Sequence, residues 1–216
     1  MPLGVRAFCR QVRLAWSIRR KGDRNLQRRQ FIAATAAMFA GAGPASAHQE
    51  QPFILPQDFL PTLVNVPPSL PAGVIHVFPN EFQLFLILPN AQGLRYTVGV
   101  GKPGLYHAGQ FTVGMKREWP SWKPTPAMIR RNPDAYARFA NGMPGGEDNP
   151  LGARALYLFD DNGHDTYLRV HGTNKPRTIG TAVSNGCARL TNDHVTDLYD
   201  RVPIGTPIIL HEQKAV

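Results

Sequence analysis

The chain has 216 residues, 43% of them apolar, and is therefore long enough to bury the core of one domain. Its formal net charge of +9 raises the question of a nucleic-acid partner, but this charge is unevenly placed. Residues 1–47 contain nine Lys or Arg and one acidic residue, whereas residues 48–216 contain 15 basic and 14 acidic residues. The positive charge belongs to the N-terminal segment, so we expect no nucleic-acid partner.

That segment has the features of a twin-arginine export signal. Arg28-Arg29 precedes a mild apolar run over residues 32–42, and Ala45-Ser46-Ala47 is a small-residue cleavage site. We predict a signal peptide over residues 1–47, read by the export machinery, with no transmembrane segment after cleavage. An uncleaved anchor is the alternative, although the apolar run is short for a bilayer core of about 30 Å.

The chain contains two cysteines, Cys9 and Cys187. Cleavage after Ala47 would remove Cys9 and leave a single thiol, which has no internal disulfide partner. A leftover thiol in an exported protein is a candidate reactive group.

Six prolines lie between residues 51 and 71 and interrupt any periodic pattern. We predict that residues 48–72 form an extended, proline-rich linker without chemistry of its own.

The remaining chain predicts a mainly β domain with a few short helices. Short β-branched and aromatic runs between Gly, Pro and Asn turns are expected as strands, at residues 74–78, 83–88, 94–100, 109–116, 156–159, 167–170 and 206–210. Short helices are expected at 127–132 and 134–140, and a longer one near 193–201, capped by Thr191 or Asn192. Its apolar spacing buries Val195, Leu198, Tyr199 and Val202 and leaves His194 at the solvent or the domain edge.

Residues 119–126 hold two tryptophans among three prolines, which excludes a helix or strand interior. Trp122 is a candidate wall of a ligand groove. Anchoring of the loop is an equally good interpretation.

The stretch from His171 to Arg189 carries the clearest chemical signal. A thiolate is a far better nucleophile than a thiol, so Cys187 needs a base. His171 follows a predicted strand, and the turn residues between it and Cys187 allow the chain to fold back.

The residues around the thiol fit acyl transfer. Gly186 allows close approach of a substrate to the backbone, and consecutive N–H groups over Asn185, Gly186 and Cys187 can stabilise an oxyanion. Ser184 is expected to fix this loop by hydrogen bonding. Arg189 offers a planar cationic fork suited to a carboxylate.

Together, His171-Gly172-Thr173, Ile179-Gly180 and the run from Ser184 to Arg189 resemble the signature of the L,D-transpeptidase (YkuD-type) catalytic domain. Asn185 stands where histidine is common in that family, and Ala188 where a larger aliphatic residue is common. The resemblance implies an L,D-transpeptidase-like β-sandwich, which we place at residues 73–212.

The resemblance also implies a reaction and a location. His171, oriented by the Gly172 carbonyl, would draw the proton from Cys187, and the thiolate would attack a peptidoglycan tetrapeptide stem and release D-alanine. An acceptor amine would resolve the thioester, forming a 3→3 cross-link or attaching a protein. The enzyme would act in the periplasm, at the cell wall, without a cofactor, and carbapenems would acylate Cys187.

Three alternatives remain open. Water could resolve the thioester, giving an L,D-carboxypeptidase or endopeptidase, or the domain could be a non-catalytic peptidoglycan-binding module. A zinc site using Cys187 and His171 would need two further ligands, and none has suitable spacing.

Overall fold

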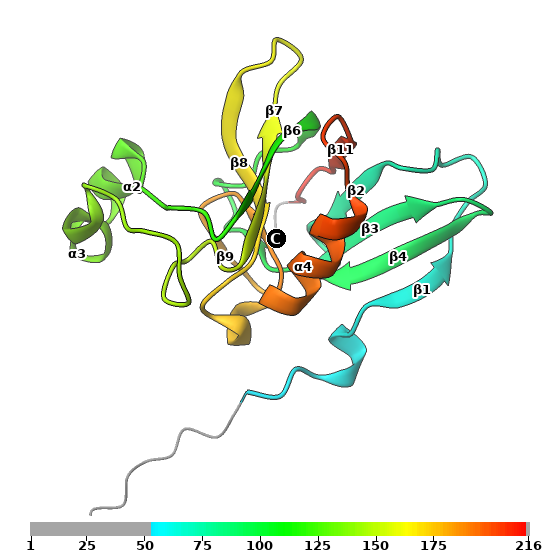
Figure 1. The fold of residues 1–216 in the computed structure, drawn as a ribbon, viewed down its shortest axis with the longest axis horizontal. Helices are drawn as coiled ribbons and strands as arrows, with labels where there is room; N and C mark the ends of the chain where they lie inside the picture. The colour runs from blue at the N-terminus through cyan, green and yellow to red at the C-terminus, as the bar shows by residue number, and fades with distance from the viewer. Residues whose placement is uncertain (1–52, 215–216) are drawn as a thin grey trace, which may run out of the picture. The chain divides into compact units, whose positions relative to one another are not determined.

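The structure is a computed structural model and describes residues 53–214. Within this range the chain is mainly β with a few short helices, as predicted (Figure 1). The predicted signal peptide over residues 1–47, with its paired arginines, lies outside the described residues. None of the helices between residues 53 and 214 has the length and apolarity needed to span a lipid bilayer.

The strands pair into one long sheet and one small one. Their bounds are β1 (Thr62–Asn65), β2 (Ile75–Phe78), β3 (Gln83–Leu88), β4 (Gln92–Thr97), β5 (Val100–Gly101), β6 (Gly109–Glu118), β7 (Arg154–Phe159), β8 (Asp165–His171), β9 (Ala182–Ser184), β10 (Ala188–Arg189) and β11 (Pro207–Leu210). Nine strands form a sheet in the order β1-β4-β3-β2-β11-β6-β7-β8-β10, and β5 pairs with β9. The β2–β11, β8–β10 and β5–β9 pairs are parallel, and the other pairs are antiparallel.

The helices are short, and polar side chains cap three of them. They are α2 (Pro126–Arg131), α3 (Pro133–Tyr136) and α4 (Asn192–Arg201), with 3-10 turns η1 (Gln57–Phe59), η2 (Ala137–Phe139) and η3 (Pro176–Thr178). Thr125 caps α2, Asn132 caps α3 and Thr191 caps α4, each accepting a backbone N–H three residues on. Proline in the first turn explains why α2 and α3 form separate helices.

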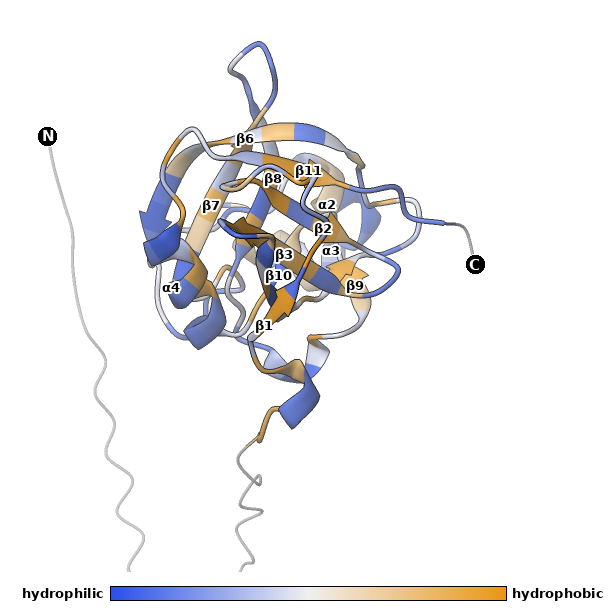
Figure 2. Cartoon of the chain, turned by 90° about the vertical axis from the view of Figure 1, so that its right-hand side faces the viewer, coloured by the Kyte–Doolittle hydropathy of each residue, from blue (hydrophilic) through white to orange (hydrophobic). Residues whose placement is uncertain are grey.

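One hydrophobic cluster joins both halves of the long sheet to α4. It includes Ile75 of β2, Tyr96 of β4 and Leu156 of β7, together with Val195 and Leu198 of α4. Figure 2 shows hydrophobic residues concentrated in the strands, whereas α4 mixes hydrophobic and hydrophilic positions. Burial of this apolar face holds α4 against the sheet.

The prediction that His194 faces solvent or the domain edge was wrong. Its side chain is only 7% exposed, and its ring lies 6.4 Å from that of Tyr96. The Tyr96 hydroxyl also donates to Asp197 at 2.5 Å. Packing against Tyr96 of β4 therefore buries His194 in addition to the apolar residues of α4.

Part of the predicted linker belongs to the sheet. Residues 62–65 lie between two prolines and form β1, which pairs antiparallel with residues 92–95 of β4. Phe59 packs on Gly180, where an added Cβ would lie 2.9 Å from the ring. A strand of four residues, within a proline-free run of five, is enough to extend a sheet edge.

A lysine on β6 caps the C-terminal end of α4. Lys116 Nζ donates to the carbonyls of Tyr199 at 2.5 Å and Val202 at 2.7 Å, and lies 4.1 Å from the Tyr199 ring centroid. A cation here satisfies carbonyls that have no partner within the helix.

We predict that Lys116→Met lowers the free energy of unfolding by about 1–3 kcal/mol, because two charge-assisted hydrogen bonds are lost while the aliphatic packing is kept. Urea unfolding followed by circular dichroism measures the effect. The exposed Lys123→Met serves as the control and should differ from the parent by no more than about 0.5 kcal/mol. Equal midpoints for the two variants would contradict the capping role.

Candidate active site

The parallel pairing of β8 with β10 brings the predicted histidine and cysteine to one place. In this pair Ala188 lies beside Val170, and Arg189 lies beside His171. Ala188 and Val170 are buried in the core, so their neighbours along each strand project from the opposite face. Cys187, Arg189 and His171 therefore share one face, with the thiol and the imidazole as diagonal neighbours.

His171 stands at the end of β8 and is only 5% exposed. Its Nδ1 lies 2.6 Å from the Gly172 carbonyl oxygen, so Nδ1 carries the hydrogen and Nε2 of the neutral ring presents a lone pair. Burial lowers the pKa of His171 to about 3, the charges of Arg189 and Arg169 add to this, and the carbonyls of Gly172 and Leu151 oppose it. The resting imidazole is therefore neutral at pH 7.

The Cys187 thiol is partly exposed and lies just before β10. Its Sγ is 4.0 Å from the Tyr167 carbonyl oxygen. Burial raises the pKa of the thiol, whereas the Arg169 N–H and the charges of Arg169 and Arg189 lower it. The net shift is upward, so the resting thiol is protonated and needs a base.

Ser184 fixes the turn that carries the thiol. Its Oγ donates to the Cys187 carbonyl at 2.7 Å and accepts the Gly186 N–H at 3.2 Å. Gly186 has a φ of +127°, and a Cβ there would lie 2.8 Å from the Leu105 carbonyl oxygen. Only glycine suits this position. The Gly186 N–H can donate to an oxyanion only after its hydrogen bond to Ser184 Oγ breaks.

The Asn185 side chain connects this turn to α2 and α3. Its Nδ2 donates to the Tyr136 hydroxyl and its Oδ1 accepts from Arg131, both at 2.9 Å. Tyr136 in turn lies 6.2 Å, and Phe139 5.7 Å, from the Trp122 ring centroid. Trp122 thus anchors the segment that holds the thiol-bearing turn, and α2 and α3 project from one side of the sheet (Figure 1).

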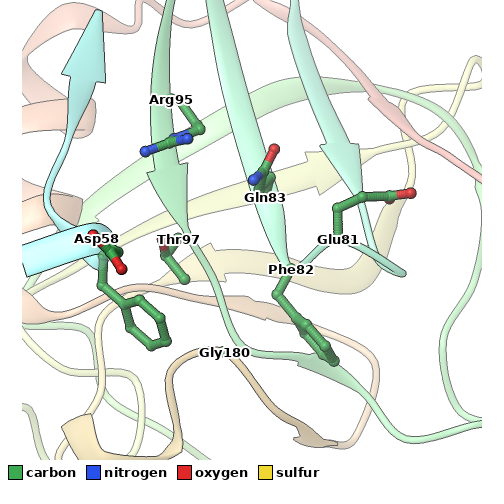
Figure 3. Close-up of a pocket in the computed structure, with 8 residues that line it drawn as sticks. Asp58, Glu81, Phe82, Gln83, Arg95, Thr97 and Gly180 are labelled. Atoms are coloured by element: carbon green, nitrogen blue, oxygen red, sulfur yellow. The ribbon is translucent and has the colours of Figure 1, made fainter. Parts of the chain in front are cut away.

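Two cavities lie outside the thiol's immediate surroundings. One, of about 420 Å³, is lined by Ser121, Trp122, Lys123 and residues 141–144. The other, of about 370 Å³, is lined by Asp58, Phe59, Glu81, Phe82, Gln83, Arg95, Thr97 and Gly180 (Figure 3). Neither cavity is lined by Cys187 or His171. Trp122 therefore borders a hollow as well as anchoring its loop.

Arg189 is a partly buried cation with unused donors. Its backbone pairs with Gly99 in both directions, at 2.8 and 2.7 Å, while its Nε and one terminal nitrogen are buried without a hydrogen-bond partner. Gly99 leaves room for the guanidinium, since a Cβ there would lie 3.3 Å from it. Unpartnered N–H groups on a planar cation suit an anion such as a carboxylate.

Several residues beside the thiol were not predicted from the sequence. Arg131 and Tyr136 contact the turn across 54 and 49 residues, and no local pattern marks such pairs. Arg169 carries a usable signal, because it lies two residues before His171 and so shares its face of the strand. Between residues 53 and 214 no group of three or more His, Cys, Asp or Glu side chains could hold a metal ion.

The part of the chain that contains this site matches known proteins. The family model of the L,D-transpeptidase catalytic domain (YkuD) matches residues 72–210. The probable L,D-transpeptidase ErfK/SrfK of Escherichia coli strain K12 is 31% identical over 157 residues, 71% of this chain and 48% of that protein. The putative L,D-transpeptidase YqjB of Bacillus subtilis strain 168 is 34% identical over 160 residues, 73% of this chain and 81% of that protein. The match thus spans about half the length of the E. coli relative and most of the B. subtilis one.

A solved structure is also similar. A protein from Brucella melitensis, described as a probable carnitine operon oxidoreductase, is 45% identical, with 76% of this chain and 96% of that chain covered and a TM-score of 0.50. Its name concerns that protein alone, and the likeness supports a shared fold.

The buried imidazole predicts acid sensitivity. Because the pKa of His171 is about 3 in the folded chain, the unfolded chain binds more protons from about pH 6.5 down to that value. Its contribution to stability is complete above about pH 6.5 and is lost as the pH falls, with a slope of up to about 1.4 kcal/mol per pH unit. His76, His194 and His211, whose pKa values are also lowered, act in the same direction.

Urea unfolding between pH 7.5 and 5 should therefore show falling stability in the parent and a shallower fall in His171→Gln. The exposed His164→Gln is the matched histidine control. A slope unchanged by His171→Gln would show that this imidazole is not the group that titrates.

Proposed function

The chain belongs to the L,D-transpeptidase catalytic domain family, and on this premise we propose that it is a peptidoglycan L,D-transpeptidase with Cys187 as its nucleophile. The observation that carries the proposal is the placement of Cys187, His171 and Arg189 on one face of the β8–β10 pair. A thiol, a neutral imidazole and a cation with unused donors are the parts that acyl transfer from a carboxylate-bearing peptide needs.

In the first half-reaction, His171 Nε2 takes the proton from Cys187 Sγ. The thiolate attacks the carbonyl carbon of the third residue of a tetrapeptide stem. The bond from that carbon to the nitrogen of the terminal D-alanine breaks, and the imidazolium returns its proton to the departing amine. The product is a thioester on Cys187.

In the second half-reaction, an amine attacks the thioester carbonyl. It gives up one proton to His171, the new C–N bond forms, the C–S bond breaks, and the thiolate regains the proton. The diamino acid of a neighbouring stem as acceptor gives a 3→3 cross-link, and a protein amine gives a protein attached to the wall. Water as acceptor gives an L,D-carboxypeptidase or endopeptidase on the same fold.

The electrostatics support a reaction that starts from neutral groups. The low pKa of His171 and the raised pKa of Cys187 favour thiol and imidazole over a resting ion pair. The negative charge that develops on the substrate oxygen then has to be stabilised by fixed donors. We assign this to the Cys187 N–H and its neighbours in the turn, each worth about 3–4 kcal/mol when well placed.

Arg189 would receive the substrate's terminal carboxylate. Its two unpartnered donors are buried, so a carboxylate seated there would be shielded from competing water. An enzyme acting on peptidoglycan works outside the cytoplasm, and this agrees with the twin-arginine-type leader proposed for residues 1–47.

We predict that the chain incubated with disaccharide tetrapeptides forms 3→3-linked dimers, and that Cys187→Ala forms none because the acyl carrier is gone. Mass spectrometry of the products is the measurement. Cys9→Ser, at the other cysteine of the chain, is the matched control and should keep full activity.

The outcomes separate the candidate reactions. Tripeptides without dimers would identify a carboxypeptidase, and turnover by Cys187→Ala would overturn the proposal. A carbapenem should add to the parent and to Cys9→Ser but leave Cys187→Ala unmodified, as read by intact mass.

The bonds made by Asn185 predict an effect on rate. Asn185→Ala removes both links from the turn to α2 and α3, and should lower kcat about tenfold, whereas Tyr136→Phe removes one link and should lower it about two- to threefold. Steady-state rates of D-alanine release provide the measurement. Asn162→Ala, in the exposed β7–β8 turn, is the control, and parental kcat in all three variants would refute the coupling.

A further inference from the structure

The strand that ends at His171 contains a β-bulge beside the thiol. Tyr157 of β7 pairs with Arg169 of β8, and Phe159 pairs with Asp165, so β8 uses two more residues than β7 between these pairs. Within the bulge, Tyr167 has a φ of +62°, a strained value for a bulky residue, and its side chain is 71% exposed. Bulges beside active sites commonly redirect backbone and side-chain groups.

A single carboxylate holds this bulge together. The Asp165 carboxylate accepts a hydrogen bond from the Tyr167 N–H at 2.8 Å. It also accepts one from each terminal nitrogen of Arg169, at 2.6 and 2.7 Å. Thr166 adds a hydrogen bond from its hydroxyl to the Leu158 carbonyl at 2.6 Å. The left-handed backbone at Tyr167 is therefore compensated by side-chain bonds on both sides.

The Arg169 guanidinium is fixed on several sides. Besides the two-pronged contact with Asp165, it donates to the Leu168 carbonyl at 2.8 Å and lies 3.9 Å from the Tyr157 ring centroid. Its side chain is 9% exposed. Such a cation loses little freedom when a negative charge forms beside it.

The bulge presents its backbone to Cys187. Because β10 begins at Ala188, opposite Val170, the part of β8 before Val170 faces the cysteine instead of a paired strand. The Tyr167 carbonyl accepts from Sγ at 4.0 Å, and the Arg169 N–H is placed to donate to the thiolate. One backbone segment thus offers an acceptor to the thiol and a donor to the thiolate.

We propose that Asp165 and Arg169 are positioning residues, which hold the Cys187 sulfur at the bulge and stabilise its thiolate during acyl transfer. The inference rests on the proposed function only in taking Cys187 as the nucleophile. The charge of Arg189 on β10 also acts on the sulfur, and His171 on β8 is its diagonal neighbour; both are unchanged in the variants below.

The reactivity of the Cys187 thiol tests whether Arg169 stabilises the thiolate. In the full chain carrying Cys9→Ser, Cys187 is the only thiol, and its alkylation by iodoacetamide can be followed against pH. Arg169→Gln should raise the alkylation pKa by about one unit and slow alkylation at pH 7 about tenfold. Arg169→Lys keeps the positive charge but loses the two-pronged contact with Asp165, and should slow alkylation about threefold.

Arg201→Gln is the matched control, because Arg201 forms an exposed pair with Asp197 at the same four-residue spacing. It should leave the alkylation profile unchanged. Identical profiles for Arg169→Gln and Arg201→Gln would overturn the proposal. Should Arg169→Gln fail to fold, as judged by circular dichroism, a parental profile in Arg169→Lys would overturn it instead.

Asp165→Asn separates positioning from charge. Removing the negative charge that pairs with Arg169 would by itself favour the thiolate and speed alkylation, whereas loosening the bulge should lower kcat for transfer about tenfold with KM changed less than about threefold. A parental kcat would overturn the positioning role. Alkylation needs no peptidoglycan, so the results for the Arg169 variants stay readable even if Cys187→Ala shows that the proposed reaction is wrong.

Discussion

The parallel pairing of β10 with β8 is the constraint on which the site depends. β10 has only two residues, so it cannot hold its place through its own ladder alone. The Gly99 backbone binds Arg189 from the other side, and the Leu190 N–H donates to the His171 carbonyl at 2.9 Å. Ala188 enters the core between them. The thiol, imidazole and guanidinium are thereby set on one face by backbone bonds and by apolar burial beneath them.

The charges and the burial around this frame favour a neutral thiol and a neutral imidazole in the resting site. Two arginines near a thiol would favour a permanent thiolate in water, but burial opposes any unpaired charge. Asp165 neutralises Arg169 locally, while Arg189 keeps two donors without partners. The folded state therefore retains a partly buried cation whose unpartnered donors suit an anion. Burying a polar group without a partner lowers the stability of the folded protein. Active sites retain such groups where a bound ligand supplies the missing partner.

Short-range patterns predicted the residues whose partners are close in sequence or in strand register. The Ser184–Arg189 run, the break before Pro133 and the apolar face of α4 follow from local chemistry, whereas the contact between His171 and Gly172 was implied by the family resemblance. Asn185 could be named but not its partners, because Arg131 and Tyr136 lie on helices about 50 residues away. The bulge at Tyr167 could not be predicted from local patterns either, because it arises where β8 has more residues than β7 between two paired positions. β1 was not predicted because the prolines on both sides outweighed a run of only five residues.

The order of strands has a consequence for how the protein comes into being. β11, which ends at Leu210, lies in the middle of the long sheet, between β2 and β6. Among the described strands, β11 comes last in the sequence, and its ladders connect the two halves of the long sheet. Pairing across so many residues carries a high entropic cost and is slow. Cys187, His171 and Arg189 all precede β11 in the sequence, so a growing chain contains these side chains before it contains the strand that makes the long sheet continuous.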